Sequence, residues 1–201
     1  MTARTVGVIG AGQMGNGIAH VCAVAGHRVL LKDISQDRLD AGLKTIERNL
    51  ARQAAKGLIG QGQVSEALAR ITPILENAPF KDADMVIEAA TENEAVKRKI
   101  FEELCASLSP EAMIATNTSS ISITRLASCT DRPERFMGVH FMNPVPLMQL
   151  VELIRGIATE EETFVAMRDF VQGLGKTTAN AEDFPAFIVN RILLPMINEA
   201  V

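Results

Sequence analysis

Residues 4–15, RTVGVIGAGQMG, decide the fold, because here a short apolar run breaks into three spaced glycines. The pattern predicts a strand, a tight turn and then a helix. Gly10 would permit the turn, Gly12 would let a pyrophosphate approach the backbone, and Gly15 would let the helix pack closely on the strand. The phosphates would lie at the helix start, where backbone N–H groups have no partner within the helix. The stretch therefore indicates a dinucleotide site.

The sequence after the glycines strengthens this interpretation. Residues 13–25 are compatible with a helix, and a second apolar run, residues 27–33, ends on Asp33. The distance from Gly15 to Asp33 is close to the spacing of about 20 residues at which a carboxylate holds the adenine ribose. A carboxylate there disfavours a 2′-phosphate, so NAD is favoured over NADP, although Arg38 leaves NADP open. A glycine-rich turn in an ordinary strand–helix–strand unit is the alternative.

Composition excludes several classes of protein. The 201 residues are 47% hydrophobic and 22% charged, which is typical of a globular chain. A net charge of −4 gives no overall attraction to nucleic acid or to a membrane surface, and no apolar run is long enough to span a bilayer. The chain begins without the apolar segment of a signal peptide, so a cytoplasmic location is expected. Cys22, Cys105 and Cys129 lack metal or redox spacing, which predicts reduced thiols and no metal site.

Strands and helices alternate along the rest of the chain. Helical patterns separate apolar runs at residues 71–75, 85–90, 113–115, 135–141, 149–154 and 177–179. Pro73 places the first of these runs at a sheet edge, because proline cannot donate to a strand ladder. The alternation predicts an α/β fold of the Rossmann type, with a doubly wound and mostly parallel sheet, over residues 1–183.

Residues 36–70 predict a helical arm within this domain. Apolar residues recur there at three- and four-residue spacing, which is the pattern of an amphipathic helix. Basic residues recur every four positions and form a stripe along one face, consisting of Lys44, Arg48, Arg52 and Lys56. The stripe is either a solvated helix face or a contact for a polyanionic ligand, and the residues alone leave both open.

Two further helices are expected. Thr91 with Glu94 forms the pattern of a capping box, which predicts a helix over residues 91–108 with Val96, Ile100, Leu104 and Leu108 on its inner face. Residues 184–201 predict another helix that is apolar almost all round, which implies burial on all sides. We expect that this segment is the first helix of an all-α second domain, and that the chain is cut inside a longer protein.

Polar side chains follow three of the predicted strands. They are Glu92, residues 117–120 and residues 140–143. Ligands of doubly wound sheets bind at the carboxyl ends of the strands, so we expect these groups to converge near a nicotinamide. His20 and His27 have no such context, and a surface or helix position without function is expected for each.

Glu152 lies inside an apolar run, where an unpaired carboxylate would carry a large desolvation cost. His140, at the end of the neighbouring predicted strand, is the best partner. A carboxylate behind an imidazole fixes its tautomer and stabilises its cation, which makes the ring a competent general base. Hydride transfer from an alcohol also needs hydrogen bonds to the developing carbonyl oxygen, and Ser119 and Asn190 supply them.

Six motifs in order resemble the 3-hydroxyacyl-CoA dehydrogenases, and within them the bacterial 3-hydroxybutyryl-CoA dehydrogenases. The resemblance covers essentially the whole chain and is far more specific than the glycine turn alone. The motifs are Gly10-Ala11-Gly12-Gln13-Met14-Gly15, Glu88-Ala89-Ala90-Thr91-Glu92-Asn93, Asn117-Thr118-Ser119-Ser120, His140-Phe141-Met142-Asn143-Pro144-Val145-Pro146, Leu150-Val151-Glu152-Leu153-Ile154 and Phe187-Ile188-Val189-Asn190-Arg191.

The resemblance implies reversible, NAD-dependent oxidation of a (3S)-3-hydroxyacyl-CoA, of short chain, to the 3-ketoacyl-CoA in fatty acid metabolism. It gives His140 as base, Glu152 as its orienting carboxylate, and Ser119 and Asn190 as substrate hydrogen-bonding groups. The cofactor contacts that it implies are Gly10, Gly12, Gln13, Met14, Gly15, Asp33, Glu92, Lys97, Ser119 and Asn143. The family's helical arm binds the coenzyme A moiety, and the matching residues are Asn49 and Lys56, which favours the functional interpretation of the basic stripe.

The chain departs from the family at its end. Full-length members continue into an all-helical domain that supplies most of a homodimer contact and closes over the substrate. A chain without that domain is expected to bind cofactor and to turn over weakly. Two alternatives therefore stay open, namely a dehydrogenase of a free hydroxy acid or sugar acid, and a catalytically inactive NAD-binding fragment.

Overall fold

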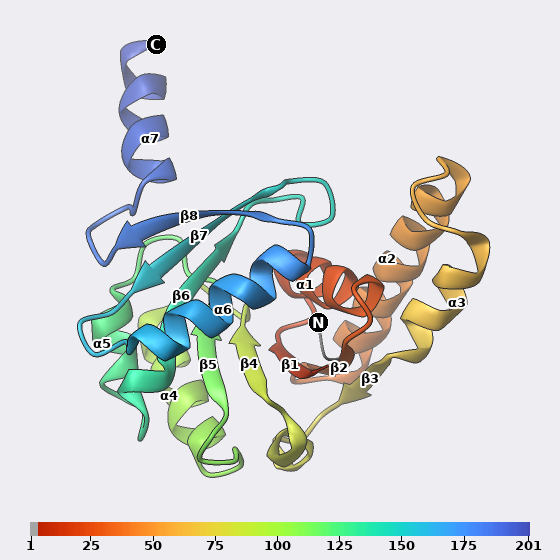
Figure 1. Ribbon diagram of the computed structural model, residues 1–201, viewed down its shortest axis with the longest axis horizontal. Helices are drawn as coiled ribbons and strands as arrows, with labels where there is room; N and C mark the ends of the chain where they lie inside the picture. The colour runs from red at the N-terminus through yellow and green to blue at the C-terminus, as the bar shows by residue number, and fades with distance from the viewer. Residues whose placement is uncertain (1–3) are drawn as a thin grey trace.

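The computed structural model describes residues 4–201 and begins with the expected strand–turn–helix unit. β1 is followed directly by the glycine turn and α1 (Figure 1). The strands are β1 Thr5–Ile9, β2 Arg28–Lys32, β3 Ile71–Ile74, β4 Met85–Glu88, β5 Met113–Thr116, β6 Phe136–Phe141, β7 Leu150–Arg155 and β8 Thr177–Glu182. The α-helices are α1 Gln13–Val24, α2 Gln36–Ala55, α3 Gln61–Ala69, α4 Glu94–Cys105, α5 Ile123–Ala127, α6 Glu161–Gly173 and α7 Val189–Glu199, and 3-10 turns occupy Ala78–Asp82 and Pro133–Arg135.

The eight strands form one sheet in the order β3-β2-β1-β4-β5-β6-β7-β8. All neighbouring strands are parallel except β6 and β7, which are antiparallel. The order reverses between β1 and β4, which is the switch point where doubly wound sheets bind their ligands. The predicted α/β class is confirmed, and the strand containing Pro73 is an edge strand as expected.

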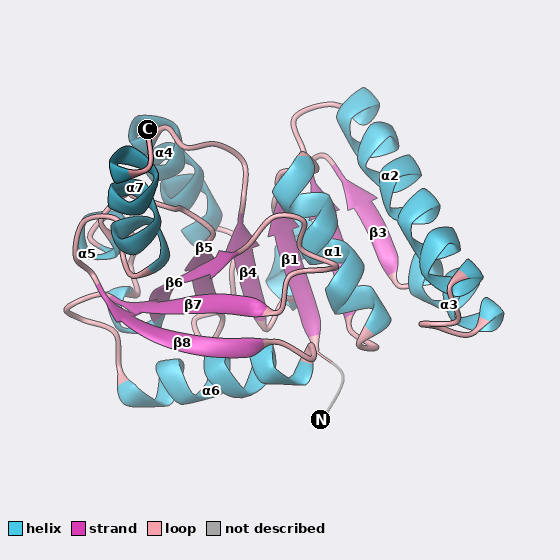
Figure 2. Cartoon of the chain, turned by 90° about the horizontal axis from the view of Figure 1, so that it is seen from above, coloured by secondary structure: helices cyan, strands magenta, loops and turns pink. Residues whose placement is uncertain are grey.

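Both faces of the sheet are covered by helices, as a parallel sheet requires. Successive strand residues alternate between two hydrophobic clusters, so that Val29 and Leu31 pack on one side and Leu30 on the other. The first cluster includes side chains of α1, α2 and α6, and the second includes those of α4 and α5. Figure 2 shows α2 and α3 lying together beside β3 at one end of the molecule, which is the arm predicted for residues 36–70.

Small residues let the turn, the first helix and the arm approach closely. A Cβ at Gly15 would lie 1.7 Å from the carbonyl oxygen of Gly10, and Gly10 itself has a φ of +101°. Gly42, in the middle of α2, fills the same role toward the arm, because a Cβ there would lie 2.8 Å from the carbonyl oxygen of Ala11. α2 is therefore seated directly on the dinucleotide turn, a contact that the sequence pattern did not reveal.

The helix predicted from Thr91 differs from the expectation. Its N-cap is Asn93, whose side chain accepts a hydrogen bond from Val96 N at 3.1 Å, and the helix begins at Glu94. Leu104 and Leu108 of the expected inner face are buried, but Val96 is 47% exposed and Lys97 is buried. Lys97 turns inward to pair with a buried carboxylate, Glu88, and this ion pair sets the face that the helix presents to the sheet.

The last helix also differs from the expectation. α7 begins at Val189 rather than near residue 184, and none of its side chains is buried among the described residues. It extends away from the sheet (Figure 1) and exposes a set of large apolar side chains, namely Ile192, Leu193, Leu194, Met196 and Ile197. Burial on all sides is thus not met within residues 4–201, and only Phe187, just before the helix, reaches the core.

The three cysteines are free thiols, as expected. Cys22 is fully buried, and burial raises the pKa of its thiol to about 12, so it is not a reactive thiolate. No helix within residues 4–201 is long and apolar enough to cross a membrane.

His20 lies in α1, in agreement with the helix alternative, whereas His27 lies in the loop before β2; both are buried, so the surface alternative is wrong. His27 Nδ1 accepts a hydrogen bond from Arg4 N at 3.1 Å, and its ring packs on Phe170 with centroids 5.2 Å apart. His20 is paired with Gln53 Oε1 at 3.0 Å. Burial is the main cause that lowers the pKa of both rings below the ordinary value of 6.5. Both histidines are therefore held neutral inside the fold.

We expect His27 to make folding sensitive to acid. Its pKa is lower in the folded chain than in the unfolded chain, so the unfolded chain binds protons more readily below pH 6.5. The contribution of His27 to the free energy of unfolding is fully present above pH 6.5. It is lost as the pH falls from 6.5 toward the pKa of His27 in the folded chain. In urea unfolding at pH 7.5, 6.5 and 5.5, His27→Asn should reduce the loss of unfolding free energy on acidification. An identical pH slope in the variant and the parent chain would contradict this assignment.

Candidate active site

The candidate site is a cleft at the carboxyl ends of the central strands. Its volume is about 560 Å³, and its walls come from segments that are far apart in the sequence. It is lined by Gly12, Gln13, Met14, Ala89, Ala90, Thr91, Glu92, Lys97, Asn117, Ser119, His140, Phe141, Met142, Asn143, Val189, Asn190 and Leu193. The three polar groups expected to converge are therefore brought together beside the glycine turn.

The glycine turn has the geometry that a dinucleotide needs. A Cβ at Gly12 would meet no atom within 4 Å, so the backbone is open where a phosphate would approach. Asp33, at the end of β2, is 6% exposed and accepts hydrogen bonds from Ala11 N at 2.6 Å and Ile34 N at 2.7 Å. The carboxylate therefore ties the glycine turn to the segment after β2. Arg38 Nε lies 4.0 Å from Asp33 Oδ1 and is largely exposed.

Glu92 organises the loop that follows β5. Its Oε1 accepts hydrogen bonds from Thr118 Oγ1 at 2.7 Å, from Ser119 N at 2.8 Å and Oγ at 3.0 Å, and from Ser120 N at 3.1 Å and Oγ at 3.0 Å. Burial alone would raise the pKa of Glu92, but these hydrogen bonds and the charge of Lys97 hold it below its ordinary value. The carboxylate is thus ionised and fixes Ser119 at the cleft.

A buried ion pair lies under the floor of the cleft. Lys97 Nζ lies 2.5 Å from Glu88 Oε2, and Thr116 Oγ1 donates to the same oxygen at 2.8 Å. Both charged side chains are almost completely buried. Glu88 Oε1 accepts from Ala90 N at 2.8 Å, so the pair also fixes the strand end. Lys97, which the resemblance gives as a cofactor contact, lines the cleft, but its ammonium is engaged with Glu88. Glu88 ends an apolar strand, which is the signal that could have revealed it.

His140 and Glu152 form the expected pair. They are directly opposite each other in the antiparallel ladder of β6 and β7. His140 Nδ1 lies 2.7 Å from Glu152 Oε2. Because a carboxylate only accepts hydrogen bonds, Nδ1 carries the proton and Nε2 is left as the basic nitrogen.

The second oxygen of Glu152 holds the start of α7. Glu152 Oε1 accepts hydrogen bonds from Ile188 N at 2.9 Å and from Val189 N at 2.8 Å. Burial would raise the pKa of Glu152, but the hydrogen bonds from His140 and from these two amides lower it below its ordinary value. One carboxylate therefore fixes both the imidazole and the first turn of the last helix.

The segment before α7 is tightly constrained. Ala186 and Phe187 both have positive φ, 66° and 48°, which is strained for residues with a Cβ. The ring of Phe187 lies 6.2 Å from that of His140, centroid to centroid. Asn190, in the first turn of α7, donates from Nδ2 to Ser119 O at 3.2 Å. The helix start therefore completes the wall of the cleft that faces His140.

Asn49 and Lys56 lie in a second, smaller cavity. It has a volume of about 280 Å³ and separates the end of α2 from the turn after β6. Its other lining residues are Arg52, Gln53, Leu58, Pro144, Pro146 and Leu147. Two members of the basic stripe, Arg52 and Lys56, thus line this cavity, whereas Lys44 and Arg48 are exposed outside it.

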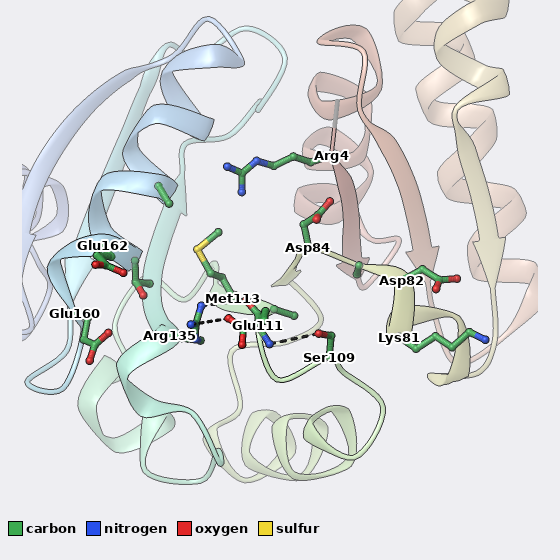
Figure 3. A pocket seen from close by; sticks show the side chains of 14 residues that line it. Arg4, Lys81, Asp82, Asp84, Ser109, Glu111, Met113, Arg135, Glu160 and Glu162 are labelled. Carbon is green, nitrogen blue, oxygen red and sulfur yellow. Dashed lines mark hydrogen bonds and ion pairs between the residues drawn. The ribbon is translucent and has the colours of Figure 1, made fainter. Parts of the chain in front are cut away.

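A further pocket lies at the amino ends of the central strands, on the side of the sheet opposite the cleft at their carboxyl ends (Figure 3). Its side chains carry both signs of charge, and Arg135 donates to Glu111 Oε2 at 2.8 Å across its floor. Asp84 is already engaged, because it accepts from Thr5 N at 2.7 Å. This pocket contains none of the predicted site residues, so the candidate site is the cleft at the carboxyl edge.

The fold and the cleft together define a dinucleotide-dependent dehydrogenase domain. Residues 5–184 match the family model described as "3-hydroxyacyl-CoA dehydrogenase, NAD binding domain". The chain is 64% identical over 198 residues to a 3-hydroxybutyryl-CoA dehydrogenase of Bradyrhizobium diazoefficiens, and the match covers 98% of this chain and 68% of that relative. The chain belongs to the 3-hydroxyacyl-CoA dehydrogenase family.

Other relatives agree in name and in structure. A probable 3-hydroxybutyryl-CoA dehydrogenase of Bacillus subtilis is 46% identical over 201 residues, covering 100% of this chain and 70% of the relative. The crystal structure of (S)-3-hydroxybutyryl-CoA dehydrogenase from Ralstonia eutropha is 47% identical with a TM-score of 0.96, covering 99% of this chain and 70% of that one. The resemblance inferred from the six motifs is confirmed.

Proposed function

We propose that this chain binds NAD and oxidises a short-chain (3S)-3-hydroxyacyl-CoA, with 3-hydroxybutyryl-CoA as the best candidate, to the 3-ketoacyl-CoA. The observation that carries the proposal is the His140–Glu152 pair, with 2.7 Å between Nδ1 and Oε2, in the same cleft as the open backbone at Gly12. A base of this kind next to a dinucleotide turn is what the oxidation of an alcohol requires.

The polar residues that carry the reaction have distinct roles in this proposal. His140 Nε2 receives the proton of the substrate hydroxyl, and Glu152 holds the ring in the tautomer that leaves this nitrogen free. Ser119 and Asn190 hydrogen-bond to the substrate oxygen while it changes from hydroxyl to carbonyl. Glu92 fixes Ser119 and its two neighbours through five hydrogen bonds, two of which come from Ser119.

The cofactor site fits NAD. Gly12, where the backbone is open, is the N-cap of α1, so the first N–H groups of this helix are proposed to bind the pyrophosphate. The remaining contacts are proposed for Gly10, Gln13, Met14, Gly15, Asp33, Glu92, Lys97, Ser119 and Asn143. The nicotinamide supplies the hydride acceptor when it is bound. Asp33 favours the unphosphorylated ribose of NAD.

The coenzyme A moiety is proposed to bind between α2 and the turn after β6. Asn49 and Lys56 line that cavity, and the cationic side chains of Arg52 and Lys56 suit its phosphates. We also propose that residues 184–201 begin a helical domain and that their exposed apolar side chains belong to a homodimer contact. A cytoplasmic location fits the three free thiols.

The direct test is NADH consumption with acetoacetyl-CoA, measured beside an NADH titration by fluorescence. The absence of Trp and Tyr leaves that fluorescence unobscured. Turnover with micromolar to millimolar KM, an ordinary range for enzymes, supports the proposal. NADH binding without any turnover would leave only the cofactor-binding part standing for this chain.

A free hydroxy acid is the competing substrate class. A solved structure described as a diketoreductase is 30% identical to this chain, with a TM-score of 0.94, so the fold alone does not fix the thioester. The same assay should therefore include free acetoacetate, and NADH production from NAD should be measured with a sugar acid in the direction of oxidation. Faster turnover of either than of acetoacetyl-CoA would replace the proposed substrate.

A further inference from the structure

One lysine holds the turn that follows the strand of His140. Lys176, just before β8, donates from Nζ to Val145 O at 2.6 Å and to Met148 O at 2.8 Å. Inside the turn, the N–H groups of Leu147 and Met148 both donate to Pro144 O at 3.0 Å. Hydrogen bonds from an ammonium are stronger than neutral ones, so Lys176 is the strongest single tie on this turn.

The other side of the turn is fixed by packing. Val145 is 2% exposed and lies against Gly17 of α1, where a Cβ would come within 2.8 Å of Val145 Cβ. Burial lowers the pKa of the Lys176 ammonium, and no carboxylate within residues 4–201 forms a salt bridge with it. The desolvated ammonium of Lys176 thus forms hydrogen bonds with two backbone carbonyls, and the turn is fixed between α1 and Lys176.

The outer side of this turn is a wall of the smaller cavity. Pro144, Pro146 and Leu147 face Asn49 and Lys56 across it, and Leu147 is 68% exposed. Lys176 does not line this cavity. It lines a neighbouring cavity together with His20, and the two cavities share the lining residues Gln53, Leu58, Pro146 and Leu147. Lys176 therefore reaches an occupant of the smaller cavity through this shared wall, which includes Pro146 and Leu147 of the turn.

We propose that Lys176 is a positioning residue for the thioester substrate, because it sets the Pro144–Leu147 wall against which the pantetheine arm lies. This inference rests on the proposed function, which puts the coenzyme A moiety between that wall and α2. The lysine touches neither substrate nor cofactor. It acts by fixing the width of the cavity.

The test compares Lys176→Met with Lys176→Arg, which keeps the charge and the donors. The dissociation constant of acetoacetyl-CoA is measured by titration calorimetry, that of NADH by fluorescence, and KM with S-acetoacetylpantetheine, which lacks the nucleotide phosphates. Lys99→Met is the matched control, since it removes an exposed lysine of α4. Thermal unfolding of each variant reports whether the fold is intact.

Lys176→Met should weaken both thioesters about tenfold, the scale of effect expected from a displaced wall, while NADH affinity stays within about twofold. Lys176→Arg should recover part of the loss, and Lys99→Met should change nothing. If Lys176→Met weakens the binding of acetoacetyl-CoA but not of the pantetheine thioester, then Lys176 acts by attracting the phosphates and the inference is overturned. Unchanged thioester affinity in this variant, or an equal loss of NADH affinity, would also overturn it. Absence of acetoacetyl-CoA binding by the parent chain would overturn the proposed function as well.

Discussion

His140→Ala should lower kcat for acetoacetyl-CoA reduction about 10³-fold, because general acid–base catalysis typically contributes about 10²- to 10⁴-fold. The variant keeps the glycine turn and Asp33, which are built from other segments, so the dissociation constant of NADH should change less than about twofold. Stopped-flow NADH oxidation and fluorescence titration measure the two quantities. Added imidazole should restore part of the rate, because the truncated side chain leaves room beside Glu152 for a free base.

His27→Asn is the matched control, because it also removes a buried imidazole but lies outside the cleft. It should keep kcat while it changes the pH slope of stability. Near-parental kcat in His140→Ala would show that another group takes the substrate proton, and the role of Glu152 would then need to be assigned anew.

Glu152→Gln should lower kcat about 10³- to 10⁴-fold without detaching α7. Only the oxygen of the new amide can accept the hydrogen bonds that Ile188 N and Val189 N donate. The NH₂ group then faces His140 and donates to Nδ1. The imidazole proton moves to Nε2, which is the nitrogen that must accept the substrate proton.

Glu152→Leu separates the two functions of the carboxylate. It leaves two amide N–H groups without an acceptor, each at a cost of about 1–3 kcal/mol when buried. Urea unfolding should therefore show a clear loss of stability in Glu152→Leu and a smaller loss in Glu152→Gln, although both lose activity. Glu102→Gln, on the exposed side of α4, is the control. Equal destabilisation by the two substitutions would contradict the inference that Glu152 Oε1 fixes the start of α7 through Ile188 N and Val189 N.

The local patterns predicted most of the fold. Glycine spacing, the apolar runs and Pro73 are properties of short segments, and they gave the parallel sheet and its edge strand correctly. The inner face of α4 was right for Leu104 but wrong for Val96, because the burial of Lys97 depends on its ion pair with Glu88 of β4. The burial of His20 and His27 was missed for the same reason, since the hydrogen bonds and packing that decide it come from Arg4, Gln53 and Phe170.

The convergence of three polar groups on one cleft was predicted, but most of the contacts that hold the cleft together were not. Glu152 was paired with His140 because a carboxylate in an apolar run needs a partner. No pattern indicated that the other oxygen of Glu152 holds α7, or that Gly42 seats α2 on the glycine turn. Backbone amides carry no sequence signal, so such contacts emerge only when the chain is folded.

The antiparallel pairing of β6 and β7 has a consequence for how such a domain can diversify. The ladder places His140 opposite Glu152, and the register is set by five residue pairs along the two strands. The turn that connects the two strands lies outside that ladder, and its residues form a wall of the neighbouring cavity. Insertions or substitutions in the turn can therefore reshape what the domain accepts while the proton-transfer pair stays in place, so selectivity and reactivity can evolve as separate traits.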